Sequence, residues 1–306
     1  MRIVVIGTGG VGGYFGGRLA LAGNDVTFIA RGKHLEAIQQ NGLLVKSVLG
    51  EFTIKPAKAT NQYNTVSEAD LVLVCTKAWQ VKEVAQLIAP FLQKETMVMP
   101  LQNGVLAANE LAEFLPEENI IGGSCRIFSM IESPGVIIHK GIDPTIVFGE
   151  LNNKETERTA WLKYTLETAG ITNIWSKDIQ ADLWKKFLMI CCSALMAVTR
   201  TNYGEIRSVP ETRSMLEELY SEIYNLGKAA GVNLPDTIVA KTMHAVDGFP
   251  AEATSSLARD VWEGKPSEIE YQNGTVVKLG EKYSVPTPVN RFVYYSVLPM
   301  ELKARK

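Results

Sequence analysis

Short runs of hydrophobic residues alternate with longer amphipathic stretches through the first part of the chain. A short apolar run rich in β-branched residues predicts a buried strand, and apolar positions at helical spacing predict a helix. Strands are expected at residues 2–6, 25–30, 71–75, 97–101 and 120–125. Helices are expected at residues 11–22, up to Phe91 after the third strand, and ahead of Pro116 after the fourth. This alternation predicts an α/β fold in which helices cover both faces of a parallel sheet.

Beyond residue 126 the pattern changes. Residues 136–139 and 145–148 are rich in β-forming residues and are separated by turn sequences, which predicts antiparallel strands at the end of the sheet. A helix at 155–169 and a strand at 171–175 follow. After that only helices are expected, at residues 178–198, 211–230, 236–246, 255–263, 268–283 and 288–303. We therefore expect a doubly wound α/β domain over residues 1–176 and an all-α domain over residues 177–306.

Composition and charge narrow the class of protein. The 306 residues carry 31 Lys and Arg against 33 Asp and Glu, and this net charge of −2 argues against a nucleic-acid binder. No apolar run is long enough to span a membrane, and the first strand starts at Arg2, so neither a membrane segment nor a signal peptide is expected. The cysteines and histidines lack metal-ligand spacing, and unpaired apolar cysteines fit a cytoplasmic protein. A homodimer is possible, but the helical half could equally pack on its own domain.

A glycine-rich turn joins the first strand to the first helix. It satisfies G-x-G-x-x-G in the strand–turn–helix context that makes this motif specific. Its residues are Gly7, Thr8, Gly9, Gly10, Val11 and Gly12. The first glycine allows the tight turn, the second lets the backbone approach a pyrophosphate, and the third lets the helix pack on the strand. Because a helix N-terminus also attracts anions, the turn predicts a dinucleotide cofactor bound to a Rossmann-type sheet.

The end of the second strand indicates which dinucleotide is bound. NAD enzymes usually carry Asp or Glu there to bind the ribose diol, whereas this chain has Arg31, with Lys33 two residues later. A guanidinium group can bind the 2′-phosphate of NADP through two hydrogen bonds. We therefore expect NADPH/NADP+, with Arg31 as the phosphate ligand. Lys33 either adds positive charge or is a solvated loop residue.

Polar residues at two other strand ends and on one helix are candidates for catalysis. Lys77 and Gln80 follow the third strand and Asn103 follows the fourth, at the carboxyl edge where open α/β sheets bind ligands. Lys185 and Lys186 point about 100° apart on a helix, so one can face solvent while the other faces a cleft. A lysine in a cleft is a suitable general acid. Taken singly, these residues could equally be turn residues and surface lysines.

Several motifs nevertheless occur in a fixed order along nearly the whole chain. They are residues 7–12, Arg31, Lys77-Ala78-Trp79-Gln80, Leu101-Gln102-Asn103-Gly104, Trp184 with Lys186, Ser255-Ser256-Leu257 with Asp260, Ser267-Glu268-Ile269-Glu270 and Asn273-Gly274. Together they resemble the ketopantoate reductase (2-dehydropantoate 2-reductase) family. The resemblance implies a Rossmann domain followed by a helical domain, and reduction of a 2-keto acid by NADPH in a cleft between the two.

The resemblance also implies roles for single residues. Lys186 matches the catalytic lysine, which hydrogen-bonds the keto oxygen and protonates the developing alkoxide. Glu268 matches the catalytic glutamate, which positions the hydroxyl groups of the substrate. Ser256 matches a serine that binds the substrate carboxylate, and Asn103 matches an asparagine beside nicotinamide and substrate. The positions that match residues lining the cofactor cleft are Lys77 and Gln80.

The chain departs from the family pattern in the expected substrate pocket. Ile190 and Ala194 stand where the family usually has asparagines, and Ala253 replaces another before the serine pair. Each lost hydrogen-bond partner costs on the order of 1 kcal/mol. We expect an NADP-dependent 2-dehydropantoate 2-reductase, an oxidoreductase acting on CH–OH groups, which supplies pantoate for pantothenate and coenzyme A biosynthesis. Two alternatives remain open: a reductase or dehydrogenase of the same family that acts on a more apolar 2-keto acid, and a non-catalytic NADP(H) sensor.

Overall fold

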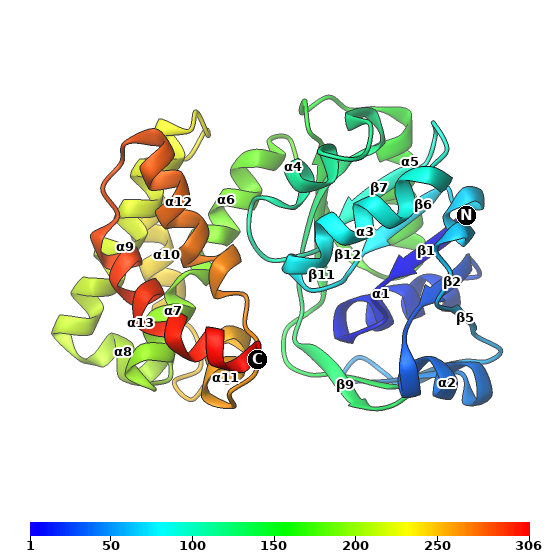
Figure 1. Ribbon diagram of the computed structural model, residues 1–306, viewed down its shortest axis with the longest axis horizontal. Helices are drawn as coiled ribbons and strands as arrows, with labels where there is room; N and C mark the ends of the chain where they lie inside the picture. Colours follow the sequence, from blue (N-terminus) through cyan, green and yellow to red (C-terminus); the bar gives the residue numbers. More distant parts are fainter. The chain divides into compact units, whose positions relative to one another are not determined.

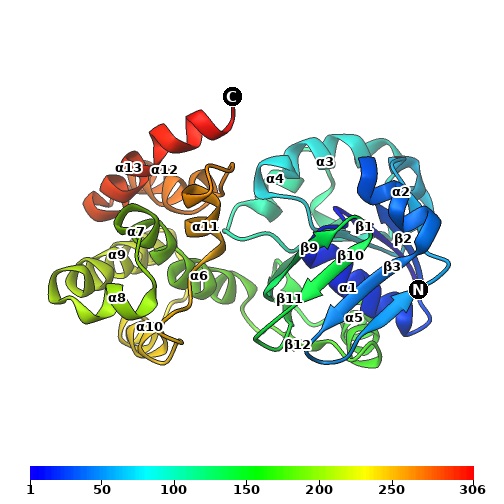
Figure 2. The same ribbon diagram turned by 90° about the horizontal axis from the view of Figure 1, so that it is seen from below.

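The computed structural model describes residues 1–306, which form two compact units. Unit 1 comprises residues 1–102 and 106–179, and it contains every strand of the protein. Unit 2 comprises residues 103–105 and 180–306 and is built from helices (Figures 1 and 2). The α/β fold with a helical C-terminal region is thereby confirmed.

A five-stranded parallel sheet forms the centre of unit 1. Its order is β5-β2-β1-β6-β7, and each neighbouring pair runs parallel. The strands are β1 (Arg2–Ile6), β2 (Asp25–Ile29), β5 (Lys58–Thr60), β6 (Leu71–Val74) and β7 (Met97–Pro100). In the register of β1, Ile3 lies opposite both Val26 and Leu71. β1, β6 and β7 are short and almost wholly buried, as continuous apolar runs in a parallel sheet require, whereas the edge strand β5 is more exposed.

Side chains alternate between two faces of this sheet, and each face has its own hydrophobic core. Val4 and Ile6 belong to a cluster that includes residues of α3 (Val81–Ile88) and α4 (Ala107–Ala112). Ile3 and Val5 belong to the other cluster, which includes residues of α1 (Gly10–Leu21). Helices therefore lie on both faces of the sheet, so that it is doubly wound (Figure 2).

A second sheet, with the order β4-β3-β10-β9, packs on the outer side of α1. Its strands are β3 (Leu43–Ser47), β4 (Phe52–Ile54), β9 (Ser129–Ser133) and β10 (Val136–His139). The prediction that residues 136–139 form an antiparallel strand at the end of the first sheet is wrong in its placement. β10 is antiparallel to β9 but parallel to β3, which is distant in the sequence. Nothing local in either strand specifies this pairing, and β3, β4, β5, β9 and α2 (Gly32–Asn41) were not predicted.

A third, three-stranded sheet has the order β12-β11-β8. It consists of β8 (Ile121–Arg126), β11 (Thr145–Glu150) and β12 (Thr172–Trp175), and α5 (Glu157–Thr168) connects the last two. β11 is antiparallel to β8, as expected, and a parallel bridge between Val98 and Ile120 links β7 to the segment that leads into β8.

Glycines let α1 approach both the first and the second sheet. On one side of the helix, a Cβ at Gly12 would collide with the carbonyl oxygen of Gly7, and one at Gly16 would lie 2.7 Å from the Phe28 ring. On the other side, a Cβ at Gly13 would lie 2.6 Å from Ile137, and one at Gly17 would lie 3.1 Å from the Phe52 ring. Ordinary side chains on these two faces would push the sheets away from the helix.

Unit 2 contains eight α-helices, of which α6 begins at its border with unit 1. They are α6 (Ile179–Ile190), α7 (Cys192–Thr199), α8 (Tyr203–Ser208), α9 (Pro210–Ala229), α10 (Ile238–Asp247), α11 (Ser256–Trp262), α12 (Asn273–Tyr283) and α13 (Pro288–Ala304). None of the helices in the protein combines the length and the apolar character that crossing a bilayer requires.

Two of the predicted helices differ from the observed ones. The helix expected at 178–198 is interrupted at Cys191, whose carbonyl oxygen accepts a hydrogen bond from the buried Asn273 amide at 3.1 Å. The helix expected at 268–283 begins only at residue 273. A short 3₁₀ turn, η5 (Ile269–Tyr271), precedes it, and the non-helical backbone angles of Gln272, φ −110° and ψ −102°, separate the two. In both cases the helix is interrupted by a contact or a change in backbone angles, although the apolar sequence pattern continues on either side.

A pair of glycine substitutions distinguishes a tightly packed position in α1 from an open position at its N-cap. Gly12→Ala should lower the free energy of unfolding by about 1–3 kcal/mol, because its methyl group overlaps the Gly7 carbonyl and lies 2.9 Å from Val5. Gly9→Ala should leave stability close to that of the wild type, because nothing lies within 4 Å of a Cβ there. Denaturant unfolding measures both, and equal stabilities of the two variants would contradict the prediction.

Candidate active site

The glycine turn after β1 is fixed by one carbonyl oxygen of β2. The Ile29 oxygen accepts hydrogen bonds from the Gly7 and Thr8 amides at 3.1 and 3.2 Å and from the Thr8 hydroxyl at 3.0 Å. Gly7 has a φ of +91°, which favours glycine, and it touches the backbone of Thr76. The turn at the N-terminus of α1 is therefore a rigid part of unit 1.

The N-terminus of α1 combines open space with backbone amides that no side chain caps. Gly9 is the N-cap, no side chain caps the helix, and its first turn carries no acid. Gly9 also has nothing within 4 Å of a Cβ, whereas Gly10 is pressed against Ser129 of β9. The expected roles of the three motif glycines thus fit the geometry. Gly7 forms the tight turn, Gly9 faces open space, and Gly12 packs on the strand. This arrangement fits a pyrophosphate at the helix N-terminus.

Buried polar atoms without partners lie near the turn. The Gln102 side chain is only 6% exposed; its Nε2 donates to the carbonyls of Val74 and Thr76 at 2.9 and 3.0 Å, while its Oε1 has no partner. Thr76 Oγ1 and Ser129 Oγ are also buried without a hydrogen bond. Native proteins rarely leave such atoms unpaired, so these three atoms are candidates to bind a polar cofactor. Thr76 and Gln102 lie in strand-end segments that the sequence highlighted, whereas nothing in the sequence indicated Ser129.

Arg31 lies directly after β2, as expected, and two neighbours orient it. Its guanidinium donates to the Tyr63 hydroxyl at 2.8 Å and lies 3.7 Å from the Glu83 carboxylate. The hydrogen bond to Tyr63 is the main cause that raises the pKa of Arg31. The side chain is 61% exposed, so an incoming phosphate can reach it, and an exposed pair with Glu83 is weak enough to be displaced. Lys33 is exposed and lies in the first turn of α2.

His34 ties the glycine turn to the β9–β10 hairpin. Its Nδ1 accepts a hydrogen bond from the Gly135 amide at 3.0 Å, so the ring proton is assigned to Nε2, which lies 2.7 Å from the Thr8 carbonyl oxygen. Burial lowers the pKa of His34 and favours the neutral ring that this arrangement requires. The sequence did not single out His34, because its partners lie on two other segments of the chain.

Lys77 and Gln80 lie at the carboxyl end of β6, on the same edge of the sheet as the glycine turn. Lys77 is exposed and precedes η2 (Ala78–Gln80), and its ammonium lies 5.8 Å from the centre of the Trp79 ring. The Gln80 amide donates to the Lys77 carbonyl at 2.9 Å, which closes the turn. Both side chains are accessible from this edge.

In unit 2 the structure brings together Asn103 and Glu268. The Asn103 amide donates to Glu268 Oε2 at 3.2 Å, although the residues are 165 positions apart. The tripeptide 103–105 belongs to unit 2, and Gly104, with a φ of +101°, passes so close to the Tyr271 carbonyl that a Cβ would lie 2.8 Å from it. Two of the predicted catalytic and substrate-binding residues are therefore neighbours.

The lysine pair and the serine pair each contain one residue with a local structural contact. Lys185 and Lys186 are both half-buried on α6, and Lys185 binds Asp182 one helical turn earlier at 2.9 Å. Ser255 is the N-cap of α11 and accepts a hydrogen bond from the Ala258 amide at 3.1 Å. Ser256 is exposed at the first position of that helix, which leaves its hydroxyl accessible to a ligand.

The two family asparagine positions have different environments. Ile190 is the last residue of α6 and is half-buried, whereas Ala194 lies in α7 and is fully buried. Ile190 is therefore the departure from the family that bears more directly on a ligand.

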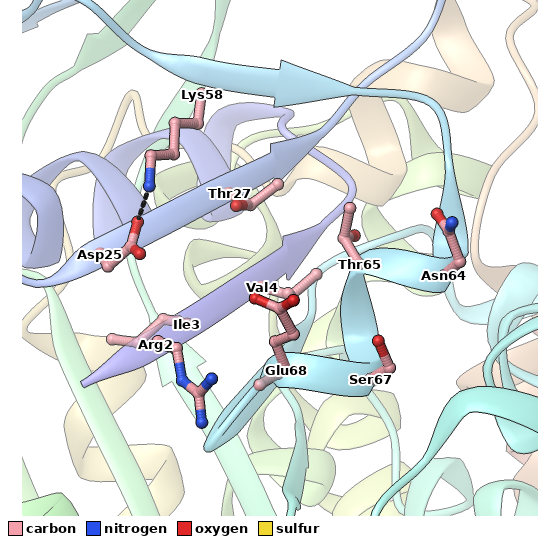
Figure 3. A pocket seen from close by; sticks show the side chains of 11 residues that line it. Arg2, Ile3, Val4, Asp25, Thr27, Lys58, Asn64, Thr65, Ser67 and Glu68 are labelled. Atoms are coloured by element: carbon pink, nitrogen blue, oxygen red, sulfur yellow. Dashed lines mark hydrogen bonds and ion pairs between the residues drawn. The ribbon is translucent and has the colours of Figure 1, made fainter.

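A hollow of about 290 Å³ lies at the opposite, amino-terminal edge of the parallel sheet (Figure 3). Three of its four charged residues are already paired: Lys58 lies 2.6 Å from Asp25, and Arg2 lies 3.8 Å from Asp70. None of the predicted site residues lines it. The protein also contains no group of three His, Cys, Asp or Glu side chains that could hold a metal ion.

Comparisons with known proteins agree with this geometry. The sequence matches the family described as "Ketopantoate reductase PanE/ApbA" over residues 3–153 and its C-terminal counterpart over residues 178–301. It is 30% identical to the "uncharacterized oxidoreductase YkpB" of Bacillus subtilis, over 96% of this chain and 97% of that protein. A crystal structure of a PanE/ApbA family ketopantoate reductase from Ralstonia eutropha has a TM-score of 0.91 and 30% identity, over 100% of both chains. D-mandelate dehydrogenase with NADH and anilino(oxo)acetate, at 24% identity, a TM-score of 0.88 and full coverage of both chains, shares the fold.

The variant His34→Gln tests whether protonation of His34 contributes to the pH dependence of stability. The pKa of His34 is lowered in the folded protein, so below about pH 6.5 the unfolded chain takes up the proton more readily, and stability should fall as the pH drops toward the lowered pKa. The stability advantage of the wild type over the variant should therefore shrink between about pH 7.5 and about pH 5. Urea unfolding at several pH values measures it, and a constant advantage would contradict the prediction.

Proposed function

Since the chain belongs to the ketopantoate reductase family, we propose that it reduces 2-dehydropantoate to pantoate with NADPH. The observation that supports this most is the hydrogen bond between Asn103 and Glu268, because residues from two separate family motifs meet there. Such a reaction supplies pantoate for pantothenate and coenzyme A biosynthesis, which is a cytoplasmic role.

Unit 1 supplies the residues that would bind the cofactor. The amides at the start of α1, next to the open Gly9, bind the pyrophosphate, and Arg31 binds the 2′-phosphate. The unpaired oxygens of Thr76, Gln102 and Ser129 fit a polar ligand near the turn, and Lys77 and Gln80 line the same sheet edge. When bound, NADPH supplies the hydride for the reduction.

Unit 2 supplies the acid and the substrate ligands. In this proposal Lys186 hydrogen-bonds the keto oxygen, stabilises the negative charge that develops on it, and donates the proton that completes the hydroxyl group. Lys186 is the acid because it matches the lysine of the family motif after Trp184, and the adjacent Lys185 pairs with Asp182. Glu268 accepts hydrogen bonds from the substrate hydroxyl, Asn103 orients Glu268 and the substrate, and the accessible Ser256 hydroxyl binds the substrate carboxylate.

A second candidate is a reductase of the same family for a more apolar 2-keto acid. Ile190 supports it, because this half-buried aliphatic residue stands where the family usually offers a hydrogen-bonding amide. A non-catalytic NADP(H) sensor is the third candidate; the retained Lys186, Glu268 and Asn103 count against it.

One assay separates these three candidates. The absorbance of NADPH is followed with ketopantoate, then with branched aliphatic and aromatic 2-keto acids. Consumption fastest with ketopantoate supports the proposed reaction, faster consumption with an apolar 2-keto acid supports the second candidate, and cofactor binding without consumption supports the sensor.

Lys186→Ala should reduce kcat by about 10²–10⁴-fold, because the general acid and the positive charge on the oxygen are both lost. The dissociation constant of NADPH should change little. Lys185→Ala is the matched control on the adjacent position and should retain nearly full turnover. If both variants turned over equally fast, Lys186 would not be the acid.

Arg31→Ala should weaken NADPH binding much more than NADH binding, because only NADPH carries the 2′-phosphate. Loss of a charge-assisted hydrogen-bonding partner predicts about 10- to 100-fold for NADPH. Fluorescence titration with both cofactors measures the effect. Lys58→Ala removes an exposed cation from the other edge of the sheet and should change neither affinity. Equal losses for NADPH and NADH in Arg31→Ala would rule out a phosphate contact.

A further inference from the structure

Glu268 lies outside any α-helix. It precedes η5, in the connection between α11 and α12, where its φ and ψ angles are −93° and 23°. Its carbonyl accepts the amides of Tyr271 and Gln272, both at 3.0 Å, but no regular helix fixes its direction. A carboxylate on such a short connection needs other contacts if it is to keep one position.

The preceding residue, Ser267, is held on three sides by the end of the chain. Its amide and its hydroxyl both donate to Glu301 Oε2, at 2.8 and 2.6 Å. Its carbonyl accepts from Arg305 Nη2 at 3.1 Å, and Arg305 Nε donates to Glu301 Oε1 at 2.5 Å. Ser267 is 0% exposed and Glu301 is 4% exposed. These contacts close a ring, which we call the C-terminal clamp, made of Ser267, Glu301 and Arg305.

α13, the helix that contains Glu301, also contacts the connection on the C-terminal side of Glu268. Tyr294 of α13 donates its hydroxyl to the Glu270 carboxylate, which also pairs with Lys278 of α12. Burial and the Glu270 carboxylate together raise the pKa of Tyr294, so it remains a donor. α13 therefore contacts the connection one residue before Glu268 and two residues after it.

We propose that Glu301 and Arg305 are positioning residues that hold the Glu268 carboxylate in place for the reaction. This inference rests on the proposed function, because it assigns to the C-terminal clamp the geometry of a residue that the proposal makes catalytic. With the amide and carbonyl of Ser267 both fixed, the Glu268 backbone starts from one defined position, and its carboxylate can meet Asn103 in one geometry. Displacing a catalytic group by about 1 Å can cost on the order of 10²-fold in rate.

Arg305 is the most suitable residue to change, because it follows the last helical residue and is partly exposed. Arg305→Ala should lower kcat by about 10- to 100-fold and leave the dissociation constant of NADPH unchanged. Arg305→Lys should recover part of the loss, since an ammonium can pair with Glu301 but lacks the fork that reaches both partners. Lys303→Ala, an exposed cation on the same helical turn, is the matched control and should behave as the wild type.

A double-mutant cycle distinguishes positioning from general destabilisation. If the clamp acts through Glu268, Arg305→Ala should have little further effect in a Glu268→Gln background, whereas independent effects would multiply. Ser267→Ala removes one hydroxyl with little change in packing, and it should reproduce the loss in kcat if Arg305→Ala fails to fold. Kinetics of Arg305→Ala or of Ser267→Ala equal to those of Lys303→Ala, or multiplicative losses in the cycle, would overturn the inference.

Hydrogen exchange tests the clamp independently of turnover. The amides of residues 267–272 should exchange faster in Arg305→Ala than in Lys303→Ala, and equal exchange would overturn the clamp. Absence of turnover by the wild type with every keto acid would instead overturn the proposed function, while the exchange result would still decide whether the C-terminal clamp holds this connection.

Discussion

The close contact of α1 with two sheets is the constraint on which the rest of unit 1 depends. Gly12 and Gly16 bring the helix against β1 and β2, while Gly13 and Gly17 bring it against the second sheet. A helix held on both sides cannot shift along its axis without collisions, because packed interiors yield little. Its N-terminus is therefore fixed next to the Ile29 carbonyl that holds the glycine turn. The pyrophosphate site that we propose there therefore depends on packing along the rest of α1.

In unit 2, different contacts hold the predicted site residues in position. Lys186 lies within α6, but the other predicted catalytic and substrate-binding residues lie on connections and at a helix end. Glu268 precedes a 3₁₀ turn, Asn103 lies in a tripeptide after β7, and Ser256 begins a helix. Such positions are not fixed by regular hydrogen bonding. Buried polar contacts from α13 to the Glu268 connection supply the missing restraint, and the Asn103 amide joins the carboxylate that they hold. In the proposed reaction, these residues thus depend on the helix that closes the chain.

The local sequence pattern predicted most of the helices and strands that can be recognised from their own residues alone. Four of the five strands of the parallel sheet, α1 and most C-terminal helices have nearly the expected bounds, because apolar period and capping residues act within a few residues of the chain. The second sheet was missed because β3 pairs with β10, almost a hundred residues away. The breaks at Cys191 and Gln272 were missed because their causes, an Asn273 side chain and a backbone ψ angle, do not interrupt the apolar pattern.

The amino-acid sequence alone was enough to predict the glycine-rich turn, the α/β fold with its helical continuation, and the family. These follow from short motifs in a fixed order, and each motif carries its chemistry locally. The folded structure was needed to show which polar atoms meet and which stay unpaired. Asn103 contacts Glu268, and His34 links the β9–β10 hairpin to the glycine turn. The unpaired oxygens belong to Gln102, Thr76 and Ser129. Such contacts join residues tens to hundreds of positions apart. Because they depend on how strands pair and helices pack, no local pattern in the chain specifies them.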